Sequence, residues 1–329
     1  MRMGSGVGVE AELRISREHN RDELRRDLAA GRAARIRRGA YTGPEPLTAD
    51  ASARARILAV HEQLSARRVF GFDTAALLYG LPTWSPSSRV HIFVRSRASS
   101  RSAKDIARHT TDLTPEDVAT IDGLPVTTLT RTVVDCALTM HPLEALVIAD
   151  GAMNRGFDRQ LALAQITARA QPNGRARAEW VITNAAAGTR SPWESWLRYL
   201  PLREGFPSPE IEPPILTRLG VMHLDLGWPP YDLYVEFDGR VKYRDDGVRT
   251  GHSAEQELLA EKRRFDAIRE TGVNPLRVMA SDGAHDYMRR LRARLPPDLR
   301  RSLRVNPRLP WPPPRVGTSS SPRALEGTK

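Results

Sequence analysis

Acidic side chains recur in two neighbouring segments that alternate between apolar and polar residues. Asp225 lies in the first segment, VMHLDLGW (221–228), and Glu236 and Asp238 lie in the second, DLYVEFDG (232–239). The alternation predicts two β-strands, and the prolines between them predict a turn. Carboxylates on neighbouring strands repel one another unless a cation lies between them. The pattern therefore indicates a cation-binding site.

The predicted hairpin brings these carboxylates onto one face. A four-residue loop at 228–231 pairs Asp225 with Tyr234 and His223 with Glu236. The polar residues that share one face are then His223, Asp225, Glu236 and Asp238. Asp225 and Glu236 become diagonal neighbours with Cβ atoms about 7 Å apart, a spacing at which two carboxylates can share a small cation.

The single cysteine of the chain limits which metal this site could hold. Cys136 lies in an apolar stretch, and one thiol can form neither an internal disulfide nor a zinc site of several thiolates. Oxygen ligands favour Mg²⁺ or Mn²⁺, which is the cofactor we expect.

Composition points to a nucleic acid partner. The 329-residue chain carries a formal net charge of +11, enough length for two or three domains, and an apolar fraction of 40%. Such an excess of positive charge favours a polyanion, with DNA first. No apolar run approaches the ~18 residues of a membrane span, and the N-terminus lacks the apolar segment of a secretory signal. We therefore expect a cytoplasmic protein without a membrane partner.

The N-terminal region has the layout of a winged helix. Residues 1–15 are predicted to be disordered, and 16–48 to form a helix from Ser16 to Gly31 followed by a basic strand and turn. The residues expected to contact phosphate are Arg21, Arg25, Arg35, Arg37 and Arg38. The alternative is a solvated arginine face in an arginine-rich chain.

Four further regions follow. Residues 49–140 predict an α/β support domain, and the glycine-punctuated 141–189 a helical connector. Residues 190–295 predict a helix, three strands, a helix and a strand, which is a mixed sheet flanked by helices in an α/β (α+β) fold. The proline- and arginine-rich 296–329 is predicted to be disordered.

Glu194 has two competing roles. In SPWE (191–194), Ser191 can cap a helix, Pro192 can occupy its first position, and Glu194 can close a capping box. Alternatively, the Glu194 carboxylate contributes to the acidic site.

Two stretches of the C-terminal region, VEFDGRVKY (235–243) and AEKRRFDAIRETG (260–272), resemble the PD-(D/E)XK nuclease superfamily, and in particular proteins related to very-short-patch-repair endonucleases. The resemblance implies a restriction-endonuclease-like fold in which Asp225 and Glu236 bind Mg²⁺ and Glu194 is an outer acidic ligand. RGAY (38–41) resembles the wing of AbiEi-type antitoxins of type IV toxin-antitoxin systems, which implies a cognate toxin as a partner.

The chain departs from the superfamily pattern at Asp238. The superfamily carries a lysine there, two residues after the glutamate, which helps to activate water and to neutralise charge on the phosphate. Lys242 or Lys262, two of four lysines in the chain, could supply the missing cation. His252, or else His223, could act as the general base.

Three hypotheses follow. The first is a DNA-binding protein with a Mg²⁺-dependent endonuclease-like domain that hydrolyses phosphodiester bonds. The second is an antitoxin-like transcriptional regulator with a catalytically inactive nuclease fold, and a homodimer would suit paired half-sites. The third is a structural network in which Arg240 and Arg244 neutralise the acidic residues.

Overall fold

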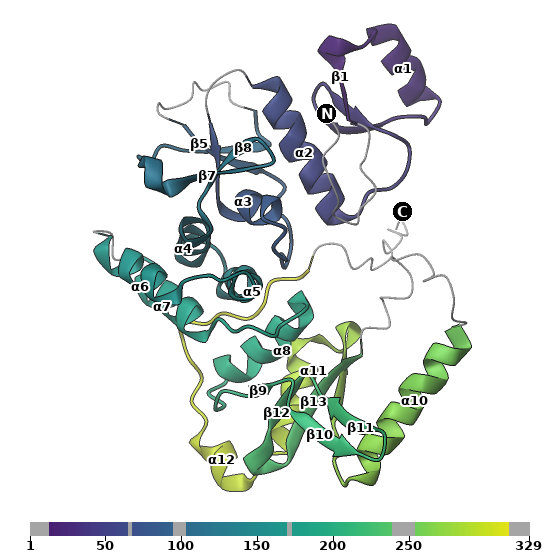
Figure 1. Ribbon diagram of the computed structural model, residues 1–329, viewed down its shortest axis with the longest axis vertical. Coiled ribbons are helices and arrows are strands. Elements are labelled where there is room, and N and C mark those ends of the chain that lie inside the picture. The colour runs from purple at the N-terminus through teal and green to yellow at the C-terminus, as the bar shows by residue number, and fades with distance from the viewer. Residues whose placement is uncertain (1–12, 65–67, 95–102, 170–172, 239–253, 316–329) are drawn as a thin grey trace, which may run out of the picture. The chain divides into compact units, whose positions relative to one another are not determined.

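A computed structural model describes residues 13–64, 68–94, 103–169, 173–238 and 254–315 of the chain (Figure 1). Their helices and mixed sheets form an α+β structure. The chain divides into two compact units, one of Met1–Met140, Arg155–Thr183 and Pro313–Lys329 and the other of His141–Asn154 and Asn184–Pro312. The predicted connector at 141–189 is therefore divided between the two units. None of the described helices is both long and apolar enough to cross a bilayer.

The first unit begins with a small antiparallel sheet and one helix. In sheet order the strands are β1 (Arg14–Ile15), β3 (Ala40–Thr42) and β2 (Ala34–Arg37), and the helix is α1 (Arg21–Ala29). Ile15 is buried, so the disorder predicted for 1–15 is wrong at its end, whereas 1–12 lie outside the described residues. Ser16 begins a 3-10 turn, and Asn20 caps α1 instead by accepting the N–H of Asp22 at 2.9 Å.

A five-stranded mixed sheet forms the core of the first unit. In sheet order its strands are β6 (Ile106–His109), β5 (Val90–Phe93), β4 (Val69–Phe70), β8 (Leu124–Thr127) and β7 (Val118–Ile121). Its helices are α2 (Ala49–Gln63), α3 (Phe72–Leu78), α4 (Leu129–Thr139), α6 (Arg159–Ala168) and α7 (Arg175–Asn184). The chain passes from β8 into α4 at Thr128, whose side chain caps the helix.

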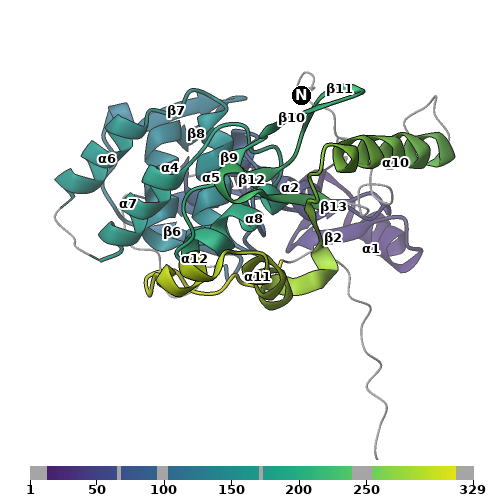
Figure 2. The ribbon, with the colours of Figure 1, turned by 90° about the horizontal axis from the view of Figure 1, so that it is seen from below.

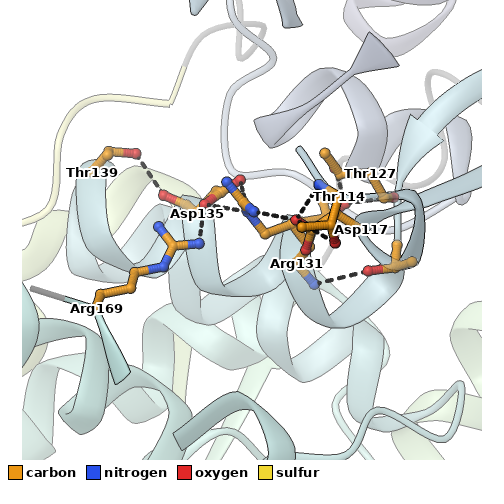
Figure 3. A network of polar contacts seen from close by, with 9 residues as sticks. Thr114, Asp117, Thr127, Arg131, Asp135, Thr139 and Arg169 are labelled. Carbon is orange, nitrogen blue, oxygen red and sulfur yellow. Dashed lines mark hydrogen bonds and ion pairs between the residues drawn. The ribbon is translucent and has the colours of Figure 1, made fainter. Parts of the chain in front are cut away.

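A buried ion-pair network joins α4 to its neighbours in this unit (Figure 3). Arg131 donates to Asp135 and to Asp117, both at 2.9 Å, and Arg169 donates to Asp135 at 2.7 Å. Asp117 ends the 3-10 turn before β7, and Arg169 follows α6. Since breaking a buried pair exposes its partner charge to an apolar interior, this network fixes how three segments pack.

The second unit is built on a four-stranded mixed sheet. In sheet order its strands are β14 (Leu276–Met279), β13 (Leu233–Asp238), β12 (Leu226–Trp228) and β9 (Glu210–Ile211). Strands β13 and β14 run parallel, and the other neighbours are antiparallel. A separate hairpin, β10 (Pro214–Thr217) with β11 (Gly220–His223), lies beside α10 (Figure 2). The helices are α5 (Pro142–Met153), α8 (Pro192–Arg203), α10 (Ala254–Glu270), α11 (Gly283–Ala293) and α12 (Pro297–Ser302).

Side chains of β13 alternate between two helices. Trp193 of α8 stacks on Phe237 with ring centroids 4.9 Å apart, on the side where Val235 is buried. Glu236 points the other way and pairs with Arg264 of α10. The predicted polar face of the hairpin therefore lies against α10.

The hairpin register differs from the prediction by two residues. The loop has four residues, as predicted, but it spans 229–232, so that Trp228 pairs with Leu233 and Leu226 with Val235. Asp232 ends it in the left-handed region, at φ +49°. A shift of two preserves which side chains share a face, because strand side chains alternate with period two.

The disorder predicted for 296–329 is wrong as far as residue 315, and 316–329 lie outside the described residues. Leu309 is buried. The ring of Trp311 stacks on that of His285 with centroids 4.1 Å apart, and the guanidinium carbon of Arg203 lies 4.2 Å from the centroid of the Trp311 ring. A proline- and arginine-rich segment can thus bury surface through its few large side chains and through cation–π contacts.

Candidate functional site

Asp225 and Glu236 meet at the end of the β12–β13 ladder. The N–H of Asp225 donates to Glu236 Oε2 at 3.2 Å, and the N–H of Phe237 donates to Asp225 Oδ2 at 2.6 Å. Each carboxylate is thus held by the opposite chain segment. The pair lies directly across the ladder and not diagonally as predicted, because of the two-residue shift in register.

Arg264 of α10 supplies the cation at this pair. Its Nη1 donates to Glu236 Oε1 at 2.8 Å, its Nη2 donates to the carbonyl of His223 at 2.6 Å, and Glu261 lies 3.5 Å from Nη1. Burial raises the pKa of Glu236 above its ordinary value, although Arg264 opposes that shift. Burial thus disfavours the ionised form of Glu236, and a further cation close to its carboxylate would stabilise that form.

Sequence reasoning missed Arg264 because it searched for a displaced lysine. Arginines are numerous in this chain, so no single one stood out. One signal was present: Arg264 lies four residues before Ile268, which is fully buried, and residues at this spacing share a helix face. The helix face that packs on the sheet therefore also carries the cation.

Asp238 forms a second ion pair on the same face of the sheet as Glu236. It accepts from Arg277 at 2.8 Å, and the guanidinium of Arg277 stacks over Phe265 at 4.1 Å. Arg277 lies across the parallel ladder from Glu236. The predicted partners of the acidic residues, Arg240 and Arg244, lie outside the described residues. Within the described part of the chain, Arg264 of α10 and Arg277 of β14 form ion pairs with Glu236 and Asp238.

A hollow of about 290 Å³ opens beside Asp238. The residues that line it are Asp238, Arg277, Met279, Asp282 and Arg290. Arg290 donates to Asp282 at 2.7 Å and to the carbonyl of Arg277 at 2.6 Å. The hollow thus combines carboxylates, guanidinium groups and one thioether at the carboxyl ends of β13 and β14.

Two other residues that were predicted to act in catalysis, Lys262 and His223, make no side-chain ion pair or hydrogen bond with Asp225 or Glu236 in the described part of the chain. Lys262 is exposed on α10, and Lys242 and His252 lie outside the described residues. His223 belongs to β11, whereas Asp225 lies in the bend before β12. The exposed His223 ring forms a hydrogen bond with the carbonyl of Glu212 at 2.9 Å. The strand predicted over 221–228 breaks between β11 and β12, which separates His223 from the carboxylate face.

Glu194 binds the residues at the start of α8, in a pattern related to the predicted capping box, with Arg190 donating the backbone N–H in place of Ser191. One of its oxygens accepts the N–H of Arg190 at 2.7 Å, the other accepts the hydroxyl of Ser191 at 2.9 Å, and its own N–H donates to that hydroxyl at 3.4 Å. The neighbouring Trp193 packs on Phe237, on the face of β13 opposite to Glu236. The structure thus places Glu194 in the capping role that competed with the ligand role.

The donor set suits a magnesium ion with few protein ligands. Within the described residues, no three or more histidine, cysteine or acidic side chains lie close enough to enclose a metal. Mg²⁺ commonly binds one or two carboxylates and keeps several waters or substrate phosphate oxygens. Asp225 and Glu236 fit this pattern.

The N-terminal arginines divide into two groups. Arg21, Arg25, Arg35 and Arg38 are exposed, with 82% of the Arg25 side chain accessible. Arg37 is 7% exposed and donates to Asp105 at 2.7 Å, so its predicted role in phosphate binding is wrong. A register shift in β2 between Arg35 and Arg37 accounts for the difference, since the two side chains no longer share one environment.

No family model, curated protein or solved structure matches this chain. The assignment of function therefore depends on the geometry of the site and on charge.

Proposed function

We propose that this protein binds DNA through its N-terminal unit and hydrolyses phosphodiester bonds with Mg²⁺ or Mn²⁺ held at Asp225 and Glu236. The proposal includes a winged-helix module and a restriction-endonuclease-like C-terminal domain. The observation that carries it is the Asp225–Glu236 carboxylate pair, which two neighbouring segments hold together through backbone N–H groups.

The residues of the chain would share the chemistry as follows. A bound divalent cation lowers the pKa of coordinated water and polarises phosphoryl oxygens. Asp225 and Glu236 fix the position of that cation, because each also accepts a backbone N–H across the ladder. Arg264 forms an ion pair with Glu236 and can stabilise negative charge that develops on the phosphate. It would take the place of the lysine that the superfamily has at Asp238.

Nicking of a supercoiled plasmid tests the catalytic part. We expect Mg²⁺-dependent nicking by the wild type and a loss of about 100-fold or more in Asp225→Asn, since single charge-stabilising groups contribute on this scale. Glu270→Gln is the matched control, because Glu270 is an exposed acid on α10 that pairs with Arg218. Equal nicking by all three proteins would exclude the assigned site.

The second candidate is an antitoxin-like transcriptional regulator whose nuclease fold is inactive. It is favoured by the ion pairs of Glu236 with Arg264 and of Asp238 with Arg277, which neutralise both acids without a metal. It predicts operator binding that weakens steeply with salt but is the same in EDTA and in Mg²⁺. A cognate toxin would then be its protein partner.

A further inference from the structure

The hollow beside Asp238 lies on the same sheet face as the carboxylate pair. Asp238 follows Glu236 by two positions on β13, so the hollow begins about 7 Å further along the strand. Across the parallel ladder, Arg277 pairs with Glu236 and Met279 with Asp238. A DNA strand with its phosphate at Asp225 and Glu236 would therefore place a neighbouring nucleotide at the hollow.

The charges of the described lining residues favour neither a phosphate nor a metal ion as the occupant. Among the described residues, two aspartates and two arginines line the hollow, so their formal charges cancel. The carboxylates of Asp238 and Asp282 repel a phosphate, and the guanidinium groups of Arg277 and Arg290 repel a metal ion. An uncharged ligand with donors and acceptors on one edge fits this surface.

We propose that the hollow receives a single nucleobase of the bound DNA, an inference that rests on the proposed function. Guanidinium groups donate to base acceptors such as guanine O6 and N7, and carboxylates accept from base amino groups. Met279, which is 41% exposed, offers a thioether to the face of an aromatic ring. The volume of about 290 Å³ is near the lower limit of roughly 300 Å³ for small-molecule pockets, a size that suits a small ligand such as one base.

A base can enter only after it leaves the helical stack, since its edge is engaged in a paired duplex. Unstacking is least costly in single-stranded segments. The substrate class is therefore DNA in which the base next to the cleaved bond is free to leave the stack, and duplex DNA must give up one base to bind in this way.

The test uses the full-length chain in EDTA with an oligonucleotide that carries 2-aminopurine, a base whose fluorescence rises when it unstacks. Met279→Trp fills the hollow and leaves Asp225, Glu236 and Arg264 unchanged. Leu259→Trp, at a 49% exposed position of α10, is the matched control. Anisotropy of an end-labelled strand reports binding independently, and melting curves check that both variants fold.

We expect a several-fold rise in fluorescence with wild type and Leu259→Trp, and less than half that rise with Met279→Trp at equal DNA affinity. The same rise in all three proteins would overturn the pocket assignment and leave the nuclease proposal intact. A Met279-dependent rise without plasmid nicking would instead support the pocket and contradict the hydrolytic function. Absence of DNA binding by the wild type would overturn both proposals.

Discussion

Replacement of Arg264 with methionine distinguishes a metal site from a structural ion pair. The Glu236 side chain is 12% exposed and that of Arg264 25%. Removing one partner costs about 3–5 kcal/mol for a buried pair and about 0–1 kcal/mol for an exposed one, so we expect a loss of about 2 kcal/mol in EDTA. Such a loss corresponds to a fall of about 5 °C in melting temperature.

A divalent cation should recover this loss, because it would replace the missing positive charge. A ligand at 100 times its dissociation constant stabilises the folded state by about 2.7 kcal/mol. Calorimetric melting of Arg264→Met should therefore show a gain of several degrees on adding Mg²⁺ at that level. Arg264→Met/Asp225→Asn should show none, and Arg263→Met, an exposed arginine at the next position, should melt like the wild type. An equal response to Mg²⁺ in the single and double variants would refute the reasoning.

Four further predictions concern other parts of the chain. Arg35→Ala/Arg38→Ala should weaken DNA binding and reduce the slope of log affinity against log salt by about 0.9 per lost phosphate contact, without changing the melting temperature. Arg37→Ala should lower the melting temperature instead, since it removes a buried guanidinium and leaves the partly exposed Asp105 without this partner. Weaker DNA binding by Arg37→Ala at an unchanged melting temperature would contradict the structural role of Arg37. Burial raises the pKa of Asp73 to about 6, so its ionised form destabilises the folded state above that pH, and Asp73→Asn should stabilise the protein by up to about 3 kcal/mol at pH 8. The gain should shrink as the pH falls from about 6 and approach zero below the ordinary pKa of 3.8, where Asp73 is protonated in both the folded and the unfolded state. A pH-independent gain in urea titrations would contradict this cause. Gly205→Ala should destabilise by more than 1 kcal/mol in the same assay, because Gly205 has φ +85° and a Cβ there would lie 2.3 Å from the carbonyl oxygen of Arg304.

Local signals in the sequence were sufficient for several elements of the site. The Ser191 cap, the four-residue hairpin loop and the alternation around Glu236 each depend on residues that are close together in the sequence. The loop was misplaced by one residue because Asp232 adopts a left-handed conformation that its residue type permits but does not require. The carboxylate face was still predicted, since the resulting shift in register is even.

Contacts between distant segments were beyond sequence reasoning. Arg264 pairs with Glu236, which is 28 positions away in the sequence, and Arg37 pairs with Asp105, which is 68 positions away. The sequence around a basic residue does not show whether its side chain faces solvent or pairs with a buried acidic side chain. For a similar reason, residues 296–315 were predicted to be disordered although they are ordered. Their Trp311 packs on Arg203 and His285, which belong to helices far away in the sequence.

Calorimetric titration of Mg²⁺ into the full-length protein tests the central claim most directly. The account predicts one site with a dissociation constant in the micromolar range that is lost in Asp225→Asn and unchanged in Glu270→Gln. Binding of the same strength in Asp225→Asn, or no binding by the wild type in the presence of DNA, would contradict it.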